Sequence, residues 1–201
     1  MKTRNLSILL ASLLLVAGVS VAGARAENEV STPPAIGSVI EDFTLPDVDN
    51  NEHSLKTLAG QNGTVLLFIA VQCPVSNAYN ERMEKLAEDY KAKGIAVIGI
   101  NSNVAEDAAA IKAHAAEHKF SFTILKDSGN KIADKLGASV TPEAYFLDAN
   151  NKLLYHGRID NSRNPAQVES NDLRNALDST LGGKSIEKTE AKAFGCSIKR
   201  A

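Results

Sequence analysis

An uninterrupted apolar run ends beside a cysteine and a proline, after which the pattern of a helix begins. Residues 65–71 (VLLFIAV) are all apolar, as expected of a strand buried on both faces of a sheet. Pro74 suits the first position of a helix. Apolar side chains then recur at helical spacing, at Tyr79, Met83, Leu86 and Tyr90. This segment therefore predicts a buried strand followed by Cys73 at the N-terminus of a helix.

Strand and helix patterns alternate along the rest of the chain. Further strand patterns occupy residues 43–55 (as a short hairpin), 95–100, 122–125, 143–148 and 152–159. Further helix patterns occupy residues 104–115, 132–136 and 173–181, and Asn103 with Glu106 is spaced like a capping box for the first of them. Strands that alternate with helices and end in a hairpin and a last helix predict an α/β sandwich with an added N-terminal hairpin.

The first 26 residues predict a signal peptide. Lys2 and Arg4 precede an apolar run, and residues 24–26 (ARA) fit the small-x-small rule for cleavage. Cleavage after Ala26 removes three basic residues, Arg25 included, and no acid, which changes the net charge from −2 to −5. An uncleaved membrane anchor is the alternative, because the apolar run is nearly long enough to span a bilayer.

The remaining chain divides into three parts by composition. Residues 27–37 predict a polar linker, residues 38–183 one domain, and residues 184–201 a tail that carries Cys196. With cleavage, we expect an exported protein of the periplasm that has no membrane segment. The acidic balance argues against a nucleic-acid partner. Export would place both cysteines of the chain, Cys73 and Cys196, in an oxidising compartment.

A cysteine at a helix N-terminus faces free N–H groups and the positive end of the helix dipole, which favour the reactive thiolate. The hairpin 143–159 returns the chain to the edge where Cys73 lies, so we expect Arg158 near Cys73, where it would lower the pKa of the thiol further. The alternative for Cys73 is a small buried apolar side chain. The alternatives for Arg158 are a salt bridge with Asp160 or an exposed charge.

Several segments carry a resemblance to a known family. Residues 140–148 (VTPEAYFLD) and the strand before Cys73-Pro74 are similar to the thioredoxin fold, and residues 42–55 (DFTLPDVDNNEHSL) resemble the start of its redoxin branch, the alkyl hydroperoxide reductase/thiol-specific antioxidant superfamily. More closely, residues 73–103, 155–163 (YHGRIDNSR), 172–177 (DLRNAL) and 195–199 (GCSIK) resemble a peroxiredoxin-like group.

This resemblance implies a thioredoxin-like three-layer sandwich with a mixed central sheet. It implies that Pro142 follows a cis peptide bond and packs against Cys73. The implied activity is that of a thiol-disulfide oxidoreductase or peroxiredoxin-like antioxidant protein, in which Cys73 attacks a disulfide or a peroxide. The implied partner is a thiol electron donor, and no cofactor is implied. The rival hypothesis is a non-catalytic binding module whose cysteines are inert or form a structural bridge.

The chain departs from the family pattern at three positions near Cys73. Ala70 and Leu66 stand where peroxiredoxins carry a hydroxyl residue and a proline, so the hydroxyl that orients a peroxide is missing. Ser76 stands where thioredoxins carry the second cysteine. Its hydroxyl is a candidate to hydrogen-bond the thiolate or to cap the helix.

The other cysteine, Cys196, is therefore a candidate resolving cysteine. We keep three possibilities open: a bond to Cys73 within one chain, a bond to another chain or protein, or no redox role. The four histidines have no cysteine or carboxylate at metal-ligand spacing, and we expect His114 and His118 to lie on a solvated helix face rather than in a metal site.

Overall fold

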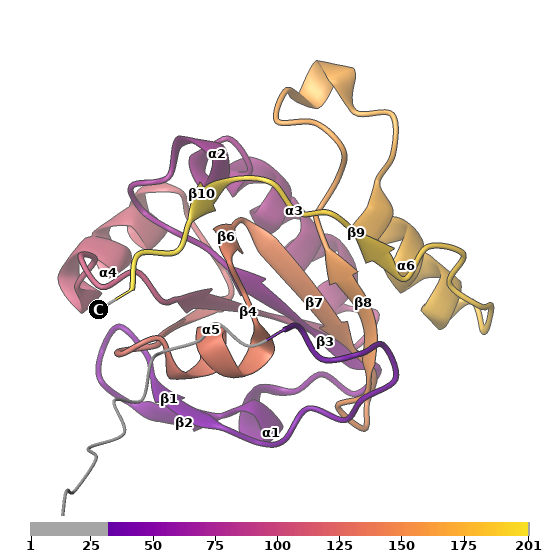
Figure 1. Cartoon of the computed structure of the whole chain (residues 1–201), viewed down its shortest axis with the longest axis horizontal. Coiled ribbons are helices and arrows are strands. Elements are labelled where there is room, and N and C mark those ends of the chain that lie inside the picture. The colour runs from indigo at the N-terminus through magenta and orange to yellow at the C-terminus, as the bar shows by residue number, and fades with distance from the viewer. Residues whose placement is uncertain (1–31, 201) are drawn as a thin grey trace, which may run out of the picture.

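Six strands form a mixed central sheet in the computed structural model, which describes residues 32–200 (Figure 1). Their order across the sheet is β5-β4-β3-β7-β8-β9. The strands are β3 (Gly63–Phe68), β4 (Ile95–Asn101), β5 (Thr123–Lys126), β7 (Glu143–Leu147), β8 (Leu153–Gly157) and β9 (Glu190–Ala191). The predicted signal peptide and the first part of the predicted linker lie outside the described residues.

Strand direction brings several chain ends to one edge of this sheet. β3 runs parallel to β4, and β4 runs parallel to β5. β7 is antiparallel to both β3 and β8, so β7 begins, and β8 ends, at the edge where β3 ends. All six residues of β3 are buried, as its apolar run predicted. The carboxyl edge of the central strands therefore lies beside both ends of the β7–β8 hairpin.

Helices cover both faces of the sheet and make a three-layer sandwich (Figure 1). They are α1 (Leu55–Leu58), α2 (Pro74–Asn77), α3 (Asn80–Lys91), α4 (Ala108–Glu117), α5 (Lys131–Leu136), α6 (Asp172–Leu181) and the 3₁₀ helix η1 (Pro165–Gln167). On one face Met83 of α3 and Leu177 of α6 pack with Val65 and Leu67. On the other face Leu136 of α5 joins a second core. Each large apolar side chain buried in this way contributes about 1.5–3 kcal/mol.

Two small two-stranded sheets complete the fold. β1 (Thr44–Pro46) and β2 (Glu52–Ser54) form the predicted N-terminal hairpin. β6 (Val140–Thr141) pairs antiparallel with β10 (Cys196–Ser197) near the C-terminus. Within residues 32–200, none of the helices has both the length and the apolar character needed to cross a membrane.

Helix starts differ from the sequence prediction at two places. The helix that begins at Pro74 breaks after α2, and α3 resumes at Asn80. α4 begins at Ala108 rather than near residue 104, because Asp107 is its cap and accepts a hydrogen bond from the Ala110 N–H at 2.8 Å. The predicted capping box was therefore wrong, and the Glu106 carboxylate is engaged elsewhere.

Candidate active site

Cys73 lies between the N-terminus of α2 and the loop that contains Pro142. Its sulfur accepts a hydrogen bond from the Ser76 N–H at 3.2 Å and donates one to the Thr141 carbonyl oxygen at 3.2 Å. The side chain is only 3% exposed. The Thr141–Pro142 peptide bond is cis, which confirms the prediction for Pro142. The strand, the helix start and the cis-proline loop thus meet at one sulfur atom.

The C-terminal tail brings the second cysteine to the same place. Cys196 lies opposite Thr141 in the β6–β10 ladder, and its thiol and backbone N–H lie close enough to the Cys73 sulfur to lower the pKa of Cys73. Neither cysteine is in a disulfide, and Cys196 is partly exposed while Cys73 is buried. Figure 1 shows β10 crossing the molecule beside α2. The fold therefore places the two thiols near each other within one chain.

The surroundings shift the pKa values of the two thiols in opposite directions. Burial by itself raises the pKa of Cys73, but the nearby Cys196 thiol and Thr141 hydroxyl and the hydrogen bond from the Ser76 N–H together lower it below its ordinary value. The pKa of Cys196 is raised, first by its hydrogen bond to Cys73 and then by burial, despite an N–H contribution from Val75. Of the two thiols, Cys73 is therefore the one that ionises at the lower pH.

The Thr141 hydroxyl is a buried group beside this sulfur. Thr141 is 2% exposed, and its Oγ1 has no hydrogen-bond partner of ordinary geometry among the described residues. It nonetheless lies close enough to Cys73 to lower the pKa of the thiol. An unpaired buried hydroxyl is costly, and a thiolate beside it would supply an acceptor.

We therefore expect Thr141→Val to raise the pKa of Cys73, because valine keeps the shape of threonine and removes the donor. The pH dependence of the ultraviolet absorbance of the thiolate measures this value. Thr141→Ser retains the hydroxyl and is the matched control, in which the low pKa should persist. An unchanged titration in Thr141→Val would show that the hydroxyl has no part in stabilising the thiolate.

Glu106 holds the loop that precedes Cys73. Its carboxylate is 2% exposed and accepts hydrogen bonds from the N–H groups of Val71 and Gln72 at 2.8 and 2.9 Å. The side chains of Asn101 and Asn103 donate to the same carboxylate at 2.6 and 3.1 Å. Burial raises the pKa of Glu106, but these donors outweigh it and lower the pKa. Sequence reasoning missed this role because it assigned Glu106 to a local helix cap.

Ser76 and Glu143 fix the rest of the site. The Ser76 hydroxyl accepts a hydrogen bond from the Ala70 N–H at 3.2 Å, so the serine contacts the Cys73 sulfur through its backbone. The buried Glu143 carboxylate, next to Pro142, accepts bonds from the N–H groups of residues 139 and 140 at 2.8 and 3.1 Å. His156 lies 2.6 Å from the same carboxylate. No pattern in the sequence indicated this second buried carboxylate.

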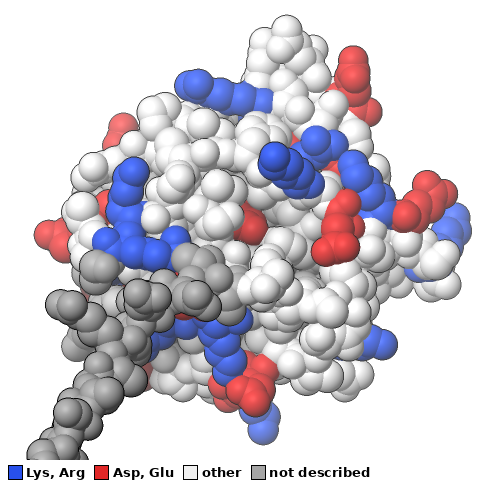
Figure 2. Space-filling view, in the orientation of Figure 1, with Lys and Arg blue, Asp and Glu red and all other residues white. Residues whose placement is uncertain are grey.

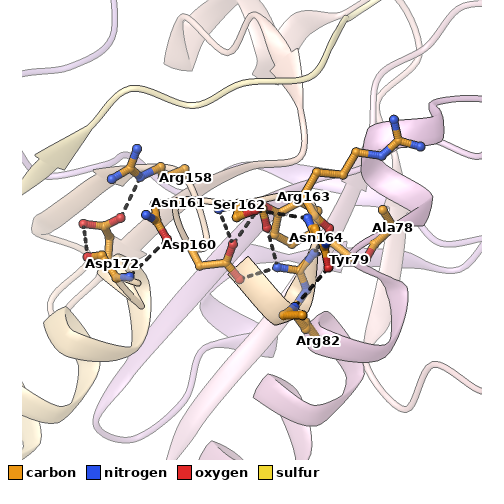
Figure 3. Close-up of polar contacts among 12 residues, drawn as sticks. Ala78, Tyr79, Arg82, Arg158, Asp160, Asn161, Ser162, Arg163, Asn164 and Asp172 are labelled. Carbon is orange, nitrogen blue, oxygen red and sulfur yellow. Dashed lines mark hydrogen bonds and ion pairs between the residues drawn. The ribbon is translucent and has the colours of Figure 1, made fainter. Parts of the chain in front are cut away.

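Arg158 was expected to act on Cys73, and the structure gives it another partner (Figure 3). Its Nε lies 2.6 Å from Oδ2 of Asp172, the first residue of α6, and Lys188 contacts the same carboxylate. Arg158 is not among the groups that most affect the pKa of Cys73. The sequence prediction placed the end of β8 at the correct edge. The guanidinium, however, binds a carboxylate at the N-terminus of α6. In this structure the guanidinium is paired with Asp172, and the effect of Arg158 on the pKa of Cys73 stays a prediction.

Asp160, the other acidic residue near Arg158, is bound from a different direction. Arg82 donates to its Oδ2 at 2.6 Å, and the Tyr79 hydroxyl donates to Oδ1 at 2.9 Å. Arg82 also donates to the carbonyl oxygens of Ser162 and Arg163, as Figure 3 shows. This cluster ties the loop after β8 to the start of α3, beside the active site.

The histidine pair on α4 does not lie on a fully solvated face. The rings of His114 and His118 have centroids 4.4 Å apart, and His114 packs against Phe120. Burial is the main cause that lowers the pKa of His114. Within residues 32–200, no group of three or more His, Cys, Asp or Glu side chains is arranged to hold a metal ion.

Residues 36–156 match the model of the AhpC/TSA family. The chain belongs to the AhpC/TSA family. It is 32% identical over 126 residues to the chloroplastic peroxiredoxin Q of Triticum aestivum, which covers 59% of this chain and 57% of that protein. It is 26% identical over 118 residues to the thiol-disulfide oxidoreductase ResA of Halalkalibacterium halodurans, with 59% and 65% covered. The chain thus spans less than two thirds of the length of these curated relatives.

Solved structures share the fold over a larger part of the chain. A hypothetical protein of Sinorhizobium meliloti 1021 matches with 31% identity and a TM-score of 0.78, covering 85% of this chain and 97% of that one. A secreted disulfide oxidoreductase of Mycobacterium tuberculosis has 20% identity and a TM-score of 0.53, with 70% and 95% covered, which indicates a shared fold. The family and the thioredoxin-like architecture that the sequence predicted are confirmed.

Proposed function

We propose that this AhpC/TSA protein is a thiol-dependent oxidoreductase in which Cys73 is the nucleophile and Cys196 of the same chain is the resolving cysteine. The supporting observation is that Cys196 pairs with Thr141, whose carbonyl oxygen binds the Cys73 sulfur, and that the pKa of Cys73 is lowered while that of Cys196 is raised. Only the thiolate attacks, so the pair has one defined nucleophile. The apolar N-terminal run further supports export to the periplasm as part of this proposal.

With a disulfide substrate, the Cys73 thiolate attacks one sulfur and releases the other as a thiolate, which leaves a mixed disulfide on Cys73. Cys196 then attacks the Cys73 sulfur, gives up its proton and releases the second substrate thiol. With a hydroperoxide, Cys73 takes a hydroxyl and becomes a sulfenic acid, while the remainder leaves as water or alcohol. Cys196 then displaces water from that sulfenic acid. Either route ends in a Cys73–Cys196 disulfide and transfers two electrons.

An external thiol must supply the electrons that restore both cysteines. Its thiolate attacks the sulfur that is accessible and expels the better leaving group. Cys196 is partly exposed, whereas Cys73 is buried and has the lower pKa. We therefore place the attack at Cys196, with Cys73 as the leaving thiolate. A second equivalent of donor then releases Cys196.

Treatment of the reduced protein with one equivalent of hydrogen peroxide or oxidised glutathione tests the proposal. We expect both thiols to disappear together and non-reducing digestion to yield a linked Cys73–Cys196 peptide from monomeric protein. Cys73→Ser is the control and should leave Cys196 largely unreacted. Recovery of Cys73 as a sulfenic acid or mixed disulfide with Cys196 free would contradict the resolving role. Two inert thiols would instead support the non-catalytic module.

A further inference from the structure

The C-terminal segment 190–200, here called the strap, is anchored on both sides of Cys196. Before the cysteine, β9 adds to the central sheet beside β8, and Phe194 meets the ring of Tyr79 edge-on with centroids 6.3 Å apart. After the cysteine, Ile198 is only 5% exposed and belongs to the second core. The Lys199 N–H then donates to the Asn103 side chain at 2.7 Å. Contacts on both sides of Cys196 therefore hold the strap across the active site.

Two glycines show how closely the strap is fitted. A Cβ on Gly157 would lie 1.9 Å from the Ala191 carbonyl oxygen, and a Cβ on Gly195 would lie 1.9 Å from the Thr141 carbonyl oxygen. No side chain larger than hydrogen is compatible with either contact unless backbone moves. Glycine is therefore needed both where the strap pairs with β6 and where β9 joins the sheet. We call this paired arrangement the closed strap.

The strap pairs with β6, a strand edge next to Cys73. Cys196 and Ser197 pair with Thr141 and Val140, and the Ile198 N–H donates to the Ser139 carbonyl oxygen at 3.0 Å. A disulfide within a polypeptide is flanked by backbone segments. An extended segment that pairs with β6 would need the backbone groups of residues 139–141 that the strap already occupies. Cys73 is 3% exposed, so a small oxidant needs only a slight opening at the sulfur and not release of this edge. The surface over α2 and β10 is mainly uncharged in Figure 2.

Resting on the proposed function, we propose that the closed strap is a specificity determinant that restricts Cys73 to small oxidants, namely hydroperoxides and low-molecular-weight disulfides. Polypeptide disulfides reach Cys73 only when the strap is released from β6. The electron balance is that of the proposed function. In both classes the Cys73 thiolate attacks the oxidant, and the oxidant leaves as water, alcohol or thiolate.

The test separates access to Cys73 from resolution by Cys196. Cys196→Ser supplies a protein with the strap closed and no resolving thiol. Adding Gly195→Ala to it places a methyl group against the Thr141 carbonyl oxygen and opens the strap. Loss of hydrogen-exchange protection at the Ile198 N–H reports the opening without any activity measurement. Lys192→Ala, at an exposed position of the same segment, is the matched control.

Single-turnover rates of Cys73 with oxidised glutathione and with insulin disulfides then test whether the strap restricts access to Cys73. If the strap is open in about one molecule in ten, the apparent affinity of Cys73 for insulin disulfides is reduced about tenfold. Opening the strap in every molecule should therefore raise the insulin rate by about tenfold or more. The glutathione rate should change by no more than about twofold, because the small disulfide does not need the β6 edge. Truncation after residue 193 is a second opened variant, which should behave like Gly195→Ala.

An insulin rate that is unchanged by opening, or that rises in step with the glutathione rate, would overturn the inference and leave the proposed function standing. The inference alone would also be overturned if the protein with the closed strap reduced insulin as fast as glutathione. A Cys73 that reacts with neither probe in any variant would overturn the proposed function as well.

Discussion

Replacing Cys196 by serine is expected to leave the first reaction of Cys73 intact and to slow the second by at least about 10³-fold. The reason is proximity: oriented neighbouring groups act at effective molarities of about 10⁵ M or more, which no free thiol can match. In the resting fold Cys196 already lies beside Cys73, opposite Thr141 in the β6–β10 ladder. The Cys196→Ser protein should therefore consume one equivalent of oxidant in a burst and then turn over slowly.

Rapid-mixing measurements with limiting and excess oxidant separate these two steps. Ser197→Ala, at the neighbouring exposed position of β10, is the matched control and should keep full turnover. Cys73→Ser should lose the burst itself. Steady-state turnover that survives in Cys196→Ser would mean that an external thiol resolves Cys73 directly, and the docked tail would then have a structural role.

Local patterns were sufficient for the main elements of the fold. The apolar run up to Val71 predicted β3, and Cys73 followed by Pro74 predicted the start of α2, because burial and helix capping are both set by near neighbours in sequence. The resemblance then placed the cis peptide bond before Pro142. These features depend on few residues each, so a single sequence contains them.

Side-chain partners depend on elements that are distant in sequence, and here the sequence failed. Asn103 and Glu106 have the spacing of a local cap, but Glu106 binds the N–H of Val71, 35 residues away. Arg158 lies at the predicted edge of the sheet. Its partner Asp172 belongs to α6, however, and no local sequence pattern reveals where α6 lies over the sheet. In both cases the edge of the sheet could be predicted and the direction of the side chain could not.

The tail lies between these extremes. Its length showed that Cys196 could reach Cys73, but several pairings stayed open. The register that places Cys196 opposite Thr141 is set by close backbone approaches at Gly195 and Gly157. A glycine in a strand is a signal for such an approach, although the sequence does not say which backbone comes near. The missing information was the partner of each glycine.

Glu106→Ala is expected to lower the free energy of unfolding by about 3 kcal/mol or more, because each buried donor left without a partner costs about 1–3 kcal/mol. Glu106 is 2% exposed, and the change would leave the buried side chains of Asn101 and Asn103 without this acceptor. Denaturant unfolding measures the loss. Glu88→Ala, on the exposed side of α3, is the matched control and should change stability little.

The same residue should make stability depend on pH in a defined direction. Because its donors hold the folded pKa of Glu106 below the ordinary value, the carboxylate stabilises the fold above the pKa of the unfolded chain, about 4.3, and this contribution is lost as the pH falls through the folded value. Glu106→Gln keeps the shape and removes the titration, so its stability should fall less steeply than that of the wild type below about pH 4.3. Parallel pH profiles for the two proteins would show that Glu106 is not the group responsible. A slower reaction of Cys73 in Glu106→Gln at neutral pH would further connect this buried carboxylate to the placement of the nucleophile, since residues 71 and 72 lead directly into it.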